Sequence, residues 1–330
     1  DGEEDISKNN SLSNACMQLD KQLDNTSADE NKLWIVKVMH YSHFLKRLEA
    51  KKHANRVRNI GLGSIKKKSK SSSGRSSQQE KKYAVSLENE KQRIRDEIKL
   101  HTLPEFVHEN VVSIARAECF PDGHAFLLFE DVGFIDLFEY LHGKVRRKTI
   151  FSRQVCEQIC RALAFLHERF NLVHNDVKPE NILIQPQTMQ CQLADFGGAT
   201  PPKTNSSYEL ITATKYFAAP ERIRNEPFDY RADSWSIGIV CCELLYYNRV
   251  ATEETVETAM NVKNPFEKVY TGDRWQRMMA QVFTEPLTES IWKNLLQPKE
   301  AEEAKWNETF LQKTVRIRPE CRESANSLFI

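Results

Sequence analysis

The stretch VHNDVKPENILI (173–184) is the feature that most constrains what this chain can fold into. An aspartate, a lysine and an asparagine follow one another at short intervals and lead into an apolar run typical of a short strand. Asp176 can accept the proton of a hydroxyl group that attacks a γ-phosphate, and Lys178 can offset charge on the transferring phosphoryl group. Asn181 offers a side-chain oxygen to Mg²⁺. The stretch therefore predicts a phosphoryl-transfer site.

Three further motifs follow in order and support this prediction. LADFGGAT (193–200) contains Asp195, which we expect to be an acidic metal ligand. AAPE (218–221) comes next, and RADSWSIG (231–238) is expected to begin a helix at Asp233 whose apolar face anchors a helical lobe. Each motif alone is weak evidence, but four of them in this order over more than sixty residues argue against coincidence.

In these motifs and their order the chain resembles the eukaryotic protein kinases. The resemblance implies an α+β fold of two lobes, a small β-rich N-lobe at residues 32–130 and a larger helical C-lobe at 131–330. It implies ATP and Mg²⁺ as cofactors and proteins as substrates. Lys178 is the residue expected in kinases that phosphorylate serine and threonine, and Thr214 lies where such kinases pair a threonine with the catalytic aspartate.

The stretch AFLLFEDVGFIDLFEYL (125–141) resembles the kinase strand, hinge and helix that hold adenosine. The resemblance implies that Phe129 is the gatekeeper and that the backbone of Glu130 and Val132 meets the adenine edge. The other nucleotide contacts that it implies are Asp136, at the ribose, and Leu183, beneath the adenine.

The last residues of the chain resemble the closing segment of a kinase domain. This segment is RIRPECRESANSL (316–328), and the resemblance implies that its Arg318 pairs with Glu221 inside the protein. The kinase-like domain is therefore expected to finish within the chain.

The N-terminal part allows two alignments of the lysine that binds ATP. In the first, NIGLGS (59–64) is a glycine-rich phosphate loop and YAVS (83–86) is the lysine strand, so that Ser86 replaces the lysine. That alignment describes a catalytically impaired pseudokinase. The loop lacks its third glycine, and Ser86 precedes Glu97 so closely that a strand end, a turn and two helical turns fit poorly between them.

In the second alignment WIVK (34–37) is the strand, Lys37 binds the α- and β-phosphates, and Glu97 pairs with Lys37. Residues 43–82 then form an insertion with thirteen Lys or Arg against two acids. The entropy of closing such a loop grows only with the logarithm of its length. The weakness of this second alignment is that residues 1–33 contain no glycine-rich loop before the strand.

The FIKK kinases of apicomplexan parasites resemble this second arrangement. They lack a recognisable glycine triad and carry the lysine in a Phe-Ile-Lys-Lys strand, to which WIVK is similar although Trp34 stands in place of the Phe. YAVSLEN (83–89) and EIKLHTLPEFVHENV (97–111) also resemble that family. The resemblance favours Lys37 over Ser86.

One position departs from the usual kinase loop, because Asn175 replaces the arginine of His-Arg-Asp. That arginine makes no bond in the reaction and meets a phosphate on the activation loop in regulated kinases. The substitution leaves Asp176 and the other catalytic residues in place, so it predicts activity without activation-loop phosphorylation. We expect His174 to pack and hydrogen-bond near the turn rather than to take a proton.

Composition sets further limits on function. Residues 1–31 are polar and acidic and predict a disordered tail with one short helix near 16–23. The net charge of +1 selects no partner class, and no apolar run is long enough to predict a membrane-spanning helix. The eight cysteines lack metal-site spacing and predict buried thiols in a reducing intracellular compartment. Since the chain begins at Asp1, a targeting signal can lie outside it.

Three functional classes remain open on these grounds. The first is an active Ser/Thr kinase, the second a pseudokinase scaffold, and the third a polyanion-binding protein that uses the basic tract 43–82. The tract lacks interleaved aromatic residues, so nucleic acid is not expected as a partner and a solvated loop explains it better. The motifs favour the kinase.

Overall fold

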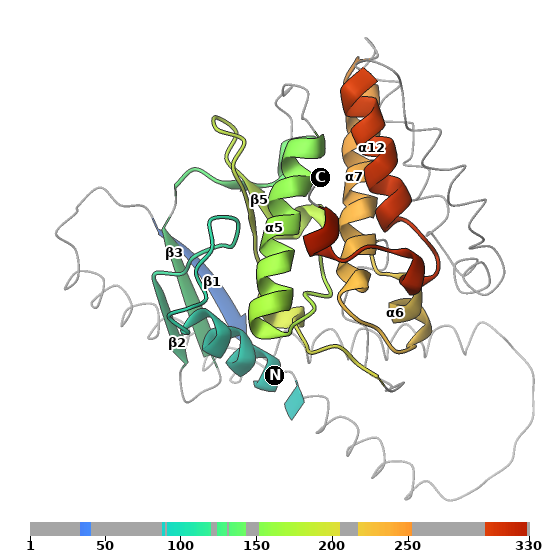
Figure 1. Cartoon of the computed structure of the whole chain (residues 1–330). Coiled ribbons are helices and arrows are strands. Elements are labelled where there is room, and N and C mark those ends of the chain that lie inside the picture. Colours follow the sequence, from blue (N-terminus) through green and yellow to red (C-terminus); the bar gives the residue numbers. More distant parts are fainter. Residues whose placement is uncertain are drawn as a thin grey trace, which may run out of the picture. The chain divides into compact units, whose positions relative to one another are not determined.

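The computed structural model describes residues 34–40, 88–89, 91–119, 124–130, 132–142, 152–204, 217–252 and 301–328 (Figure 1). The chain divides into two compact units, Asp1–Leu103 with Ile114–Val132, and Pro104–Ser113 with Gly133–Ile330. The predicted tail at 1–31, the insertion at 43–82, Ser86 and Thr214 lie outside the described residues. The predicted lobe limits, 32–130 and 131–330, stay predictions.

The described residues of unit 1 form a three-stranded antiparallel sheet. Its strand order is β1-β3-β2, with β1 at Trp34–His40, β3 at His124–Glu130 and β2 at Arg116–Cys119. The central strand β3 is a continuous apolar run and is buried along Ala125–Leu128, as expected of a strand covered on both faces. The apolar run LWIVKVM predicts a strand at 33–39, which is present one residue later as β1. The sequence also predicts a strand at about 111–119, but only β2 is present there.

Helical backbone at 88–89 and 91–101 completes the described part of unit 1. The apolar periodicity predicts a helix at about 87–103, and the described helical backbone ends two residues before that predicted end. The backbone N–H of Thr102 closes the last turn on the carbonyl of Ile98 at 3.0 Å. Pro104 disfavours helical backbone at Leu103, so the helix ends before it. Glu97 and Leu100 are the buried residues of this helix, with exposed fractions of 4% and 8%.

A second small sheet, in unit 2, positions the predicted catalytic segments. Its order is β4-β5-β6, with β4 at Ile135–Asp136, β5 at Ile182–Ile184 and β6 at Cys191–Leu193. Ile182 and Ile184 are buried while Leu183 is partly exposed, which is the alternation of a strand with one covered face. The stretch 173–181 leads directly into β5, and Asp195 follows β6.

In the described part of unit 2, three long helices supply many of the buried side chains. They are α5 at Ser152–Phe170, α7 at Arg231–Thr252 and α12 at Ala301–Thr314. α5 buries Val155, Ile159 and Leu166 at helical spacing. Both α5 and α12 pack against α7 (Figure 1). The short elements of the unit are α4 at Leu137–His142, η1 at Pro179–Asn181, η2 at Phe196–Gly198, α6 at Pro220–Arg224, η3 at Pro319–Cys321 and η4 at Ala325–Leu328.

The close approach of α7 and α12 depends on Gly238. A Cβ at this position would lie 2.5 Å from Thr314 Oγ1 and 2.6 Å from Val315 Cγ2, which are distances that real Cβ atoms do not show. Both neighbours are buried. A glycine is therefore required here by contact rather than by backbone conformation.

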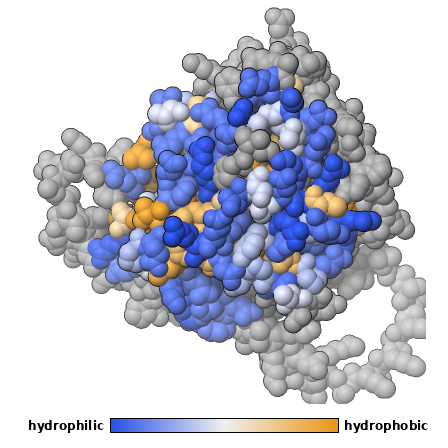
Figure 2. Space-filling model, viewed as in Figure 1, coloured by the Kyte–Doolittle hydropathy of each residue, from blue (hydrophilic) through white to orange (hydrophobic). Residues whose placement is uncertain are grey.

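The surface shown in Figure 2 is mainly hydrophilic, with apolar residues in small separate groups. Large apolar side chains that are exposed include Ile35, Val107, Val132 and Phe138. Within the part of the chain that the structure describes, no helix combines the length and the apolar character needed to cross a bilayer.

Candidate active site

Unit 1 contains the ion pair predicted for the second lysine alignment. Lys37 Nζ lies 2.7 Å from Glu97 Oε1, and the Glu97 side chain is only 4% exposed against 33% for Lys37. Lys37 stands in the middle of β1, opposite Leu127 of β3. A buried carboxylate requires a partner of opposite charge. The pairing is therefore present as predicted, while the role of Lys37 toward ATP stays a prediction.

The residues predicted to hold adenosine belong to both units. Glu130 ends β3 and Val132 follows it in unit 1. In unit 2, Asp136 of β4 is the cross-strand partner of Leu183 of β5, so the structure brings these two together. Asp136 Oδ1 also accepts the backbone N–H of Glu139 at 2.7 Å and so caps α4.

The predicted catalytic loop, residues 173–181, holds the carboxylate of Asp176 in a defined orientation. Lys178 Nζ lies 2.7 Å from Asp176 Oδ2. Asn181 Nδ2 donates to the same oxygen at 3.0 Å and to the backbone carbonyl of Asp176 at 2.8 Å. The side chain of Asp176 is 19% exposed, so it is accessible to a substrate. This geometry suits a carboxylate that receives a proton from a hydroxyl group.

Asp195 lies next to this loop in an uncommon backbone conformation. Its φ and ψ are 64° and 76°, in the left-handed region that Asp and Asn enter more readily than most residues. The preceding residue, Ala194, donates its N–H to the carbonyl of Asn181 at 2.9 Å. The following residue, Phe196, is buried and packs edge-on against Phe106 and His174.

The donor set at this place fits Mg²⁺. Because Asn181 Nδ2 faces Asp176, the amide oxygen of Asn181 faces away from it. That oxygen and the Asp195 carboxylate are hard ligands of the type that Mg²⁺ prefers, and Mg²⁺ in such sites is held by one or two carboxylates and substrate phosphates. Among the described residues, no group of three or more His, Cys, Asp and Glu side chains could hold a metal ion alone.

Asp233 fastens the catalytic loop to α7, a role that the sequence analysis missed. Its completely buried carboxylate accepts the backbone N–H groups of His174 at 2.7 Å and Asn175 at 2.9 Å. His167 Nε2 lies 2.9 Å from the same carboxylate. Burial alone would raise the pKa of Asp233, but the hydrogen bond from His167, the charges of both histidines and the His174 N–H hold it below the ordinary value.

A signal for this role is present in the sequence. Asp233 is an ionisable residue in the first turn of a segment that otherwise reads as a buried helix. A carboxylate in such a place needs polar partners inside the protein.

The two residues before Asp176 adopt structural roles. His174 is fully buried, and its Nε2 lies 3.1 Å from the carbonyl of Ala194, which confirms that it packs and hydrogen-bonds near the turn. Asn175 has a φ of 67°. Its Nδ2 lies 3.0 Å from Val173 O, 3.1 Å from Gly198 O and 3.0 Å from Thr200 Oγ1.

The prediction that Arg318 pairs with Glu221 is wrong. Arg322 makes this pair, with Nη1–Oε1 and Nη2–Oε2 distances of 2.6 and 2.8 Å. Arg318 is exposed and immediately precedes η3, whereas the chain turns inward at Arg322 and buries it against Trp235. Arg322 directly follows η3 and lies three positions before η4, whose residues Ala325 and Leu328 are buried, so it stands where the chain enters the core.

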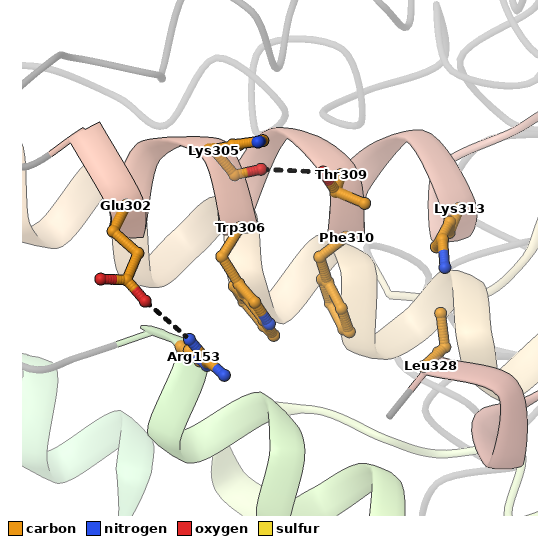
Figure 3. Close-up of a pocket in the computed structure, with 8 residues that line it drawn as sticks. All are labelled: Arg153, Glu302, Lys305, Trp306, Thr309, Phe310, Lys313 and Leu328. Carbon is orange, nitrogen blue, oxygen red and sulfur yellow. Dashed lines mark hydrogen bonds and ion pairs between the residues drawn. The ribbon is translucent and has the colours of Figure 1, made fainter. Parts of the chain in front are cut away.

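A pocket of about 240 Å³ in unit 2 contains none of the predicted catalytic residues. Trp306 and Phe310 of α12 project side by side into it, and their rings stack at 4.7 Å (Figure 3). Arg153 at the start of α5 and Leu328 of η4 face them. The pocket therefore belongs to the packing of α5, α12 and η4 and not to the phosphoryl-transfer site.

The sequence profile described as "Protein kinase domain" matches residues 55–329, most of the chain. The matched range begins after β1. It includes the two stretches of the first lysine alignment, NIGLGS (59–64) and YAVS (83–86).

Curated relatives are kinases from fungi, animals and plants. The chain is 29% identical to MAP kinase kinase MKK1/SSP32 of Saccharomyces cerevisiae over 57% of its length and 34% of the relative's. It is 31% identical to human serine/threonine-protein kinase ULK1 over 45% of its length and 15% of the relative's. For serine/threonine-protein kinase STY46 of Arabidopsis thaliana the values are 33%, 42% and 24%. The chain thus spans about a third or less of the length of these relatives.

Proposed function

The chain belongs to the protein kinase family, and we propose that it is an active enzyme that transfers the γ-phosphate of ATP to serine and threonine hydroxyls of proteins. Membership implies the two-lobed kinase fold and, in general, the use of ATP with a divalent metal. The observation that carries the proposal is the catalytic loop, in which Lys178 and Asn181 both hold the Asp176 carboxylate.

In the proposed reaction the substrate oxygen forms a bond to the γ-phosphorus while the bond from that phosphorus to the β–γ bridging oxygen breaks. The proton of the hydroxyl passes to Asp176, and ADP leaves with the electron pair of the broken bond. Lys178 offsets the negative charge that builds up on the phosphoryl oxygens. Bound Mg²⁺, held by Asn181 and Asp195, supplies electrostatic stabilisation of the phosphates.

Unit 1 supplies the second part of the proposed mechanism. Lys37 binds the α- and β-phosphates, and Glu97 keeps its ammonium group in place through the 2.7 Å pair. The adenine edge is bound by the backbone of Glu130 and Val132. Asp136 and Leu183 bind the ribose and the adenine face.

The preference for serine and threonine rests on Lys178 and on the relatives. ULK1 and STY46 are both named serine/threonine-protein kinases, and they align with this chain at 31% and 33% identity. A lysine two residues after the catalytic aspartate is expected of that class. Phosphoamino-acid analysis of a phosphorylated generic substrate tests the assignment, and phosphotyrosine as the main product would contradict it.

The main experiment measures Mg²⁺-dependent transfer of the γ-phosphate to a generic basic protein. Asp176→Asn should abolish transfer because it removes the proton acceptor, and Asp195→Ala and Asn181→Ala should each lower kcat by well over tenfold. A suitable control is Asp96→Asn, an exposed carboxylate of the helix at 91–101. Full activity of Asp176→Asn would remove the basis of the proposal.

The same enzyme is proposed to act without phosphorylation of its activation loop. The proposal rests on Asn175, which offers no guanidinium for a charge-assisted pair with a phosphate. The protein is treated with phosphatase, dephosphorylation is confirmed by mass spectrometry, and activity is measured again. We expect less than a twofold change. A loss of more than tenfold that rephosphorylation restores would show that another arginine has taken over this role.

A pseudokinase scaffold is the second candidate, and one observation favours it. The family match begins at residue 55 and so includes the alignment in which Ser86 replaces the lysine. The ion pair between Lys37 and Glu97 instead supports the second lysine alignment, in which the chain is an active kinase. The closer similarity to FIKK kinases is likewise a proposal, carried by WIVK (34–37). Inactivation by Lys37→Met with a fold unchanged by circular dichroism separates the two candidates.

A reducing intracellular compartment is proposed from the cysteines. Five of those that the structure describes are buried as free thiols, and Cys321 is exposed. Burial raises the pKa of Cys191 to about 12, and it also raises the pKa of Cys160 and Cys242 well above the ordinary value, so these thiols are poor nucleophiles. Titration with a thiol reagent under native conditions should modify Cys321 well before the buried thiols.

A further inference from the structure

We propose that Asn175 is a positioning residue for Asp195. Its side-chain amide ties Gly198 and Thr200 to the catalytic loop and thereby holds the turn that orients the Asp195 carboxylate toward Mg²⁺. The inference rests on the proposed function of Asp195 as a metal ligand and adds a residue with a role of its own to that site.

The hydrogen bonds of Asn175 connect two segments that are distant in sequence. Nδ2 lies 3.1 Å from Gly198 O and 3.0 Å from Thr200 Oγ1, both beyond Asp195 in the chain. A backbone bridge runs beside them, with Val173 N–Thr200 O at 2.8 Å and Thr200 N–Val173 O at 3.0 Å. The amide therefore reinforces a contact that already joins the catalytic loop to the segment after Asp195.

Asn175 is itself fixed from behind. Its backbone N–H donates to Asp233 Oδ1 at 2.9 Å, and its φ of 67° is a conformation that asparagine enters more readily than most residues. The backbone that carries the Asn175 amide is therefore held in place by a hydrogen bond to α7.

Asp195 lies between two anchored neighbours. On one side, Ala194 donates its N–H to Asn181 O at 2.9 Å, and its carbonyl lies 3.1 Å from His174 Nε2. On the other side, Gly198 is held by Asn175. A left-handed residue such as Asp195 persists only where the surrounding structure determines its conformation. Loss of the Asn175 amide removes the anchor of Gly198, on the C-terminal side of Asp195, and leaves the hydrogen bonds of Ala194 in place.

The orientation of the amide supports a role for its donors. Asn175 is only 8% exposed, and within the described residues its buried Oδ1 has no hydrogen-bond partner. An unpaired buried acceptor is unfavourable. A side chain that merely filled space would avoid this, so the donation by Nδ2 is what the amide supplies at this position.

The test uses variants that remove either partner of the bond. Asn175→Ala removes the donor, Thr200→Val removes one acceptor while keeping the shape of the side chain, and the double variant combines them. Thr188→Val is the matched control, because Thr188 is exposed and forms local hydrogen bonds, to Gln185 and to the backbone N–H of Gln190. Each protein is assayed for kcat, KM and half-saturating Mg²⁺, for Mg²⁺-dependent ADP binding by calorimetry, and for hydrogen exchange over residues 196–203.

For Asn175→Ala we expect the half-saturating Mg²⁺ concentration to rise by about threefold to tenfold, the effect of losing one or two hydrogen bonds. Exchange over 196–203 should quicken, while KM for the protein substrate should stay within about twofold. Thr200→Val should show a smaller change in the same direction. The double variant should resemble Asn175→Ala, because both changes break the same bond, and Thr188→Val should resemble wild type.

Unchanged Mg²⁺ dependence and unchanged exchange in both single variants would overturn the proposal. Fully additive effects in the double variant would also overturn it, since they would place the two residues in separate roles. If Asn175→Ala fails to fold, Thr200→Val still decides the matter. If wild-type protein shows no phosphoryl transfer, the proposed function fails, but calorimetry and hydrogen exchange still test whether Asn175 positions Asp195.

Discussion

Arg322→Met should cause a large loss of stability, because it leaves the Glu221 carboxylate without its partner. The two side chains are 0% and 2% exposed, and they form a bidentate pair. Arg322 also donates to the carbonyls of Arg316 at 2.6 Å and Ile317 at 3.0 Å. Breaking a buried pair from one side lowers the free energy of unfolding by about 3–5 kcal/mol.

The expected shift in melting temperature follows from this value. One kcal/mol corresponds to about 2–4 °C for a domain of 150–250 residues, so Arg322→Met should lower the midpoint by roughly 6–20 °C. Arg318→Met is the matched control, because Arg318 is an exposed arginine four positions earlier. It should change the free energy of unfolding by less than about 0.5 kcal/mol.

The assay is urea denaturation followed by tryptophan fluorescence, with a thermal scan beside it. Combining Glu221→Gln with Arg322→Met removes the unpaired buried charge, so the double variant should be more stable than Arg322→Met alone. If Arg318→Met were as destabilising as Arg322→Met, or if the double variant lost the sum of both single effects, the buried pair would not be the source of the loss.

Three further outcomes are expected. Lys37→Met should abolish phosphoryl transfer with the fold intact while Ser86→Ala is nearly silent in the same assay, and the opposite pattern would support the first lysine alignment. Gly238→Ala should lower the free energy of unfolding by about 1–3 kcal/mol, because the new Cβ meets the buried Thr314; an unchanged urea midpoint would contradict the contact. The pKa of Asp233 in the folded protein lies below its ordinary 3.8, so the ionised carboxylate contributes to stability above pH 3.8. This contribution is lost as the pH falls through the folded pKa. Asp233→Asn should therefore have a lower free energy of unfolding at neutral pH than the wild type and should lose less of it on acidification below 3.8.

Much of the proposed catalytic chemistry was predictable from the sequence alone, because it depends on residues close together in the chain. Asp176, Lys178 and Asn181 lie within one short loop, and the local backbone brings them into contact. The strand at 34–40 was likewise visible as a compact apolar run. The pair of Lys37 and Glu97 was predicted from spacing along the chain, and the structure contains it. A buried carboxylate such as Glu97 needs a partner of opposite charge, which limits the choice.

The elements that were predicted incorrectly depended on distant partners. Val111 looked like part of a strand because it lies in an apolar run, but it forms only an isolated bridge with Leu193 of β6. Periodicity records which residues are apolar and not which strand they will meet. Of the strand predicted at 111–119, only β2 is present, and residues 111–113 belong to unit 2.

The sequence by itself determined the residue types of the proposed site, since the order and spacing of the motifs place each acid, base and amide along the chain. Only the tertiary structure decided which arginine neutralises Glu221, because Arg322 reaches it across 101 positions and Arg318 has the same charge. Only the structure showed that Asn175 bonds to Gly198 and Thr200. Such contacts depend on the direction in which a buried side chain points, and that direction is set by packing against α7 rather than by neighbours in sequence.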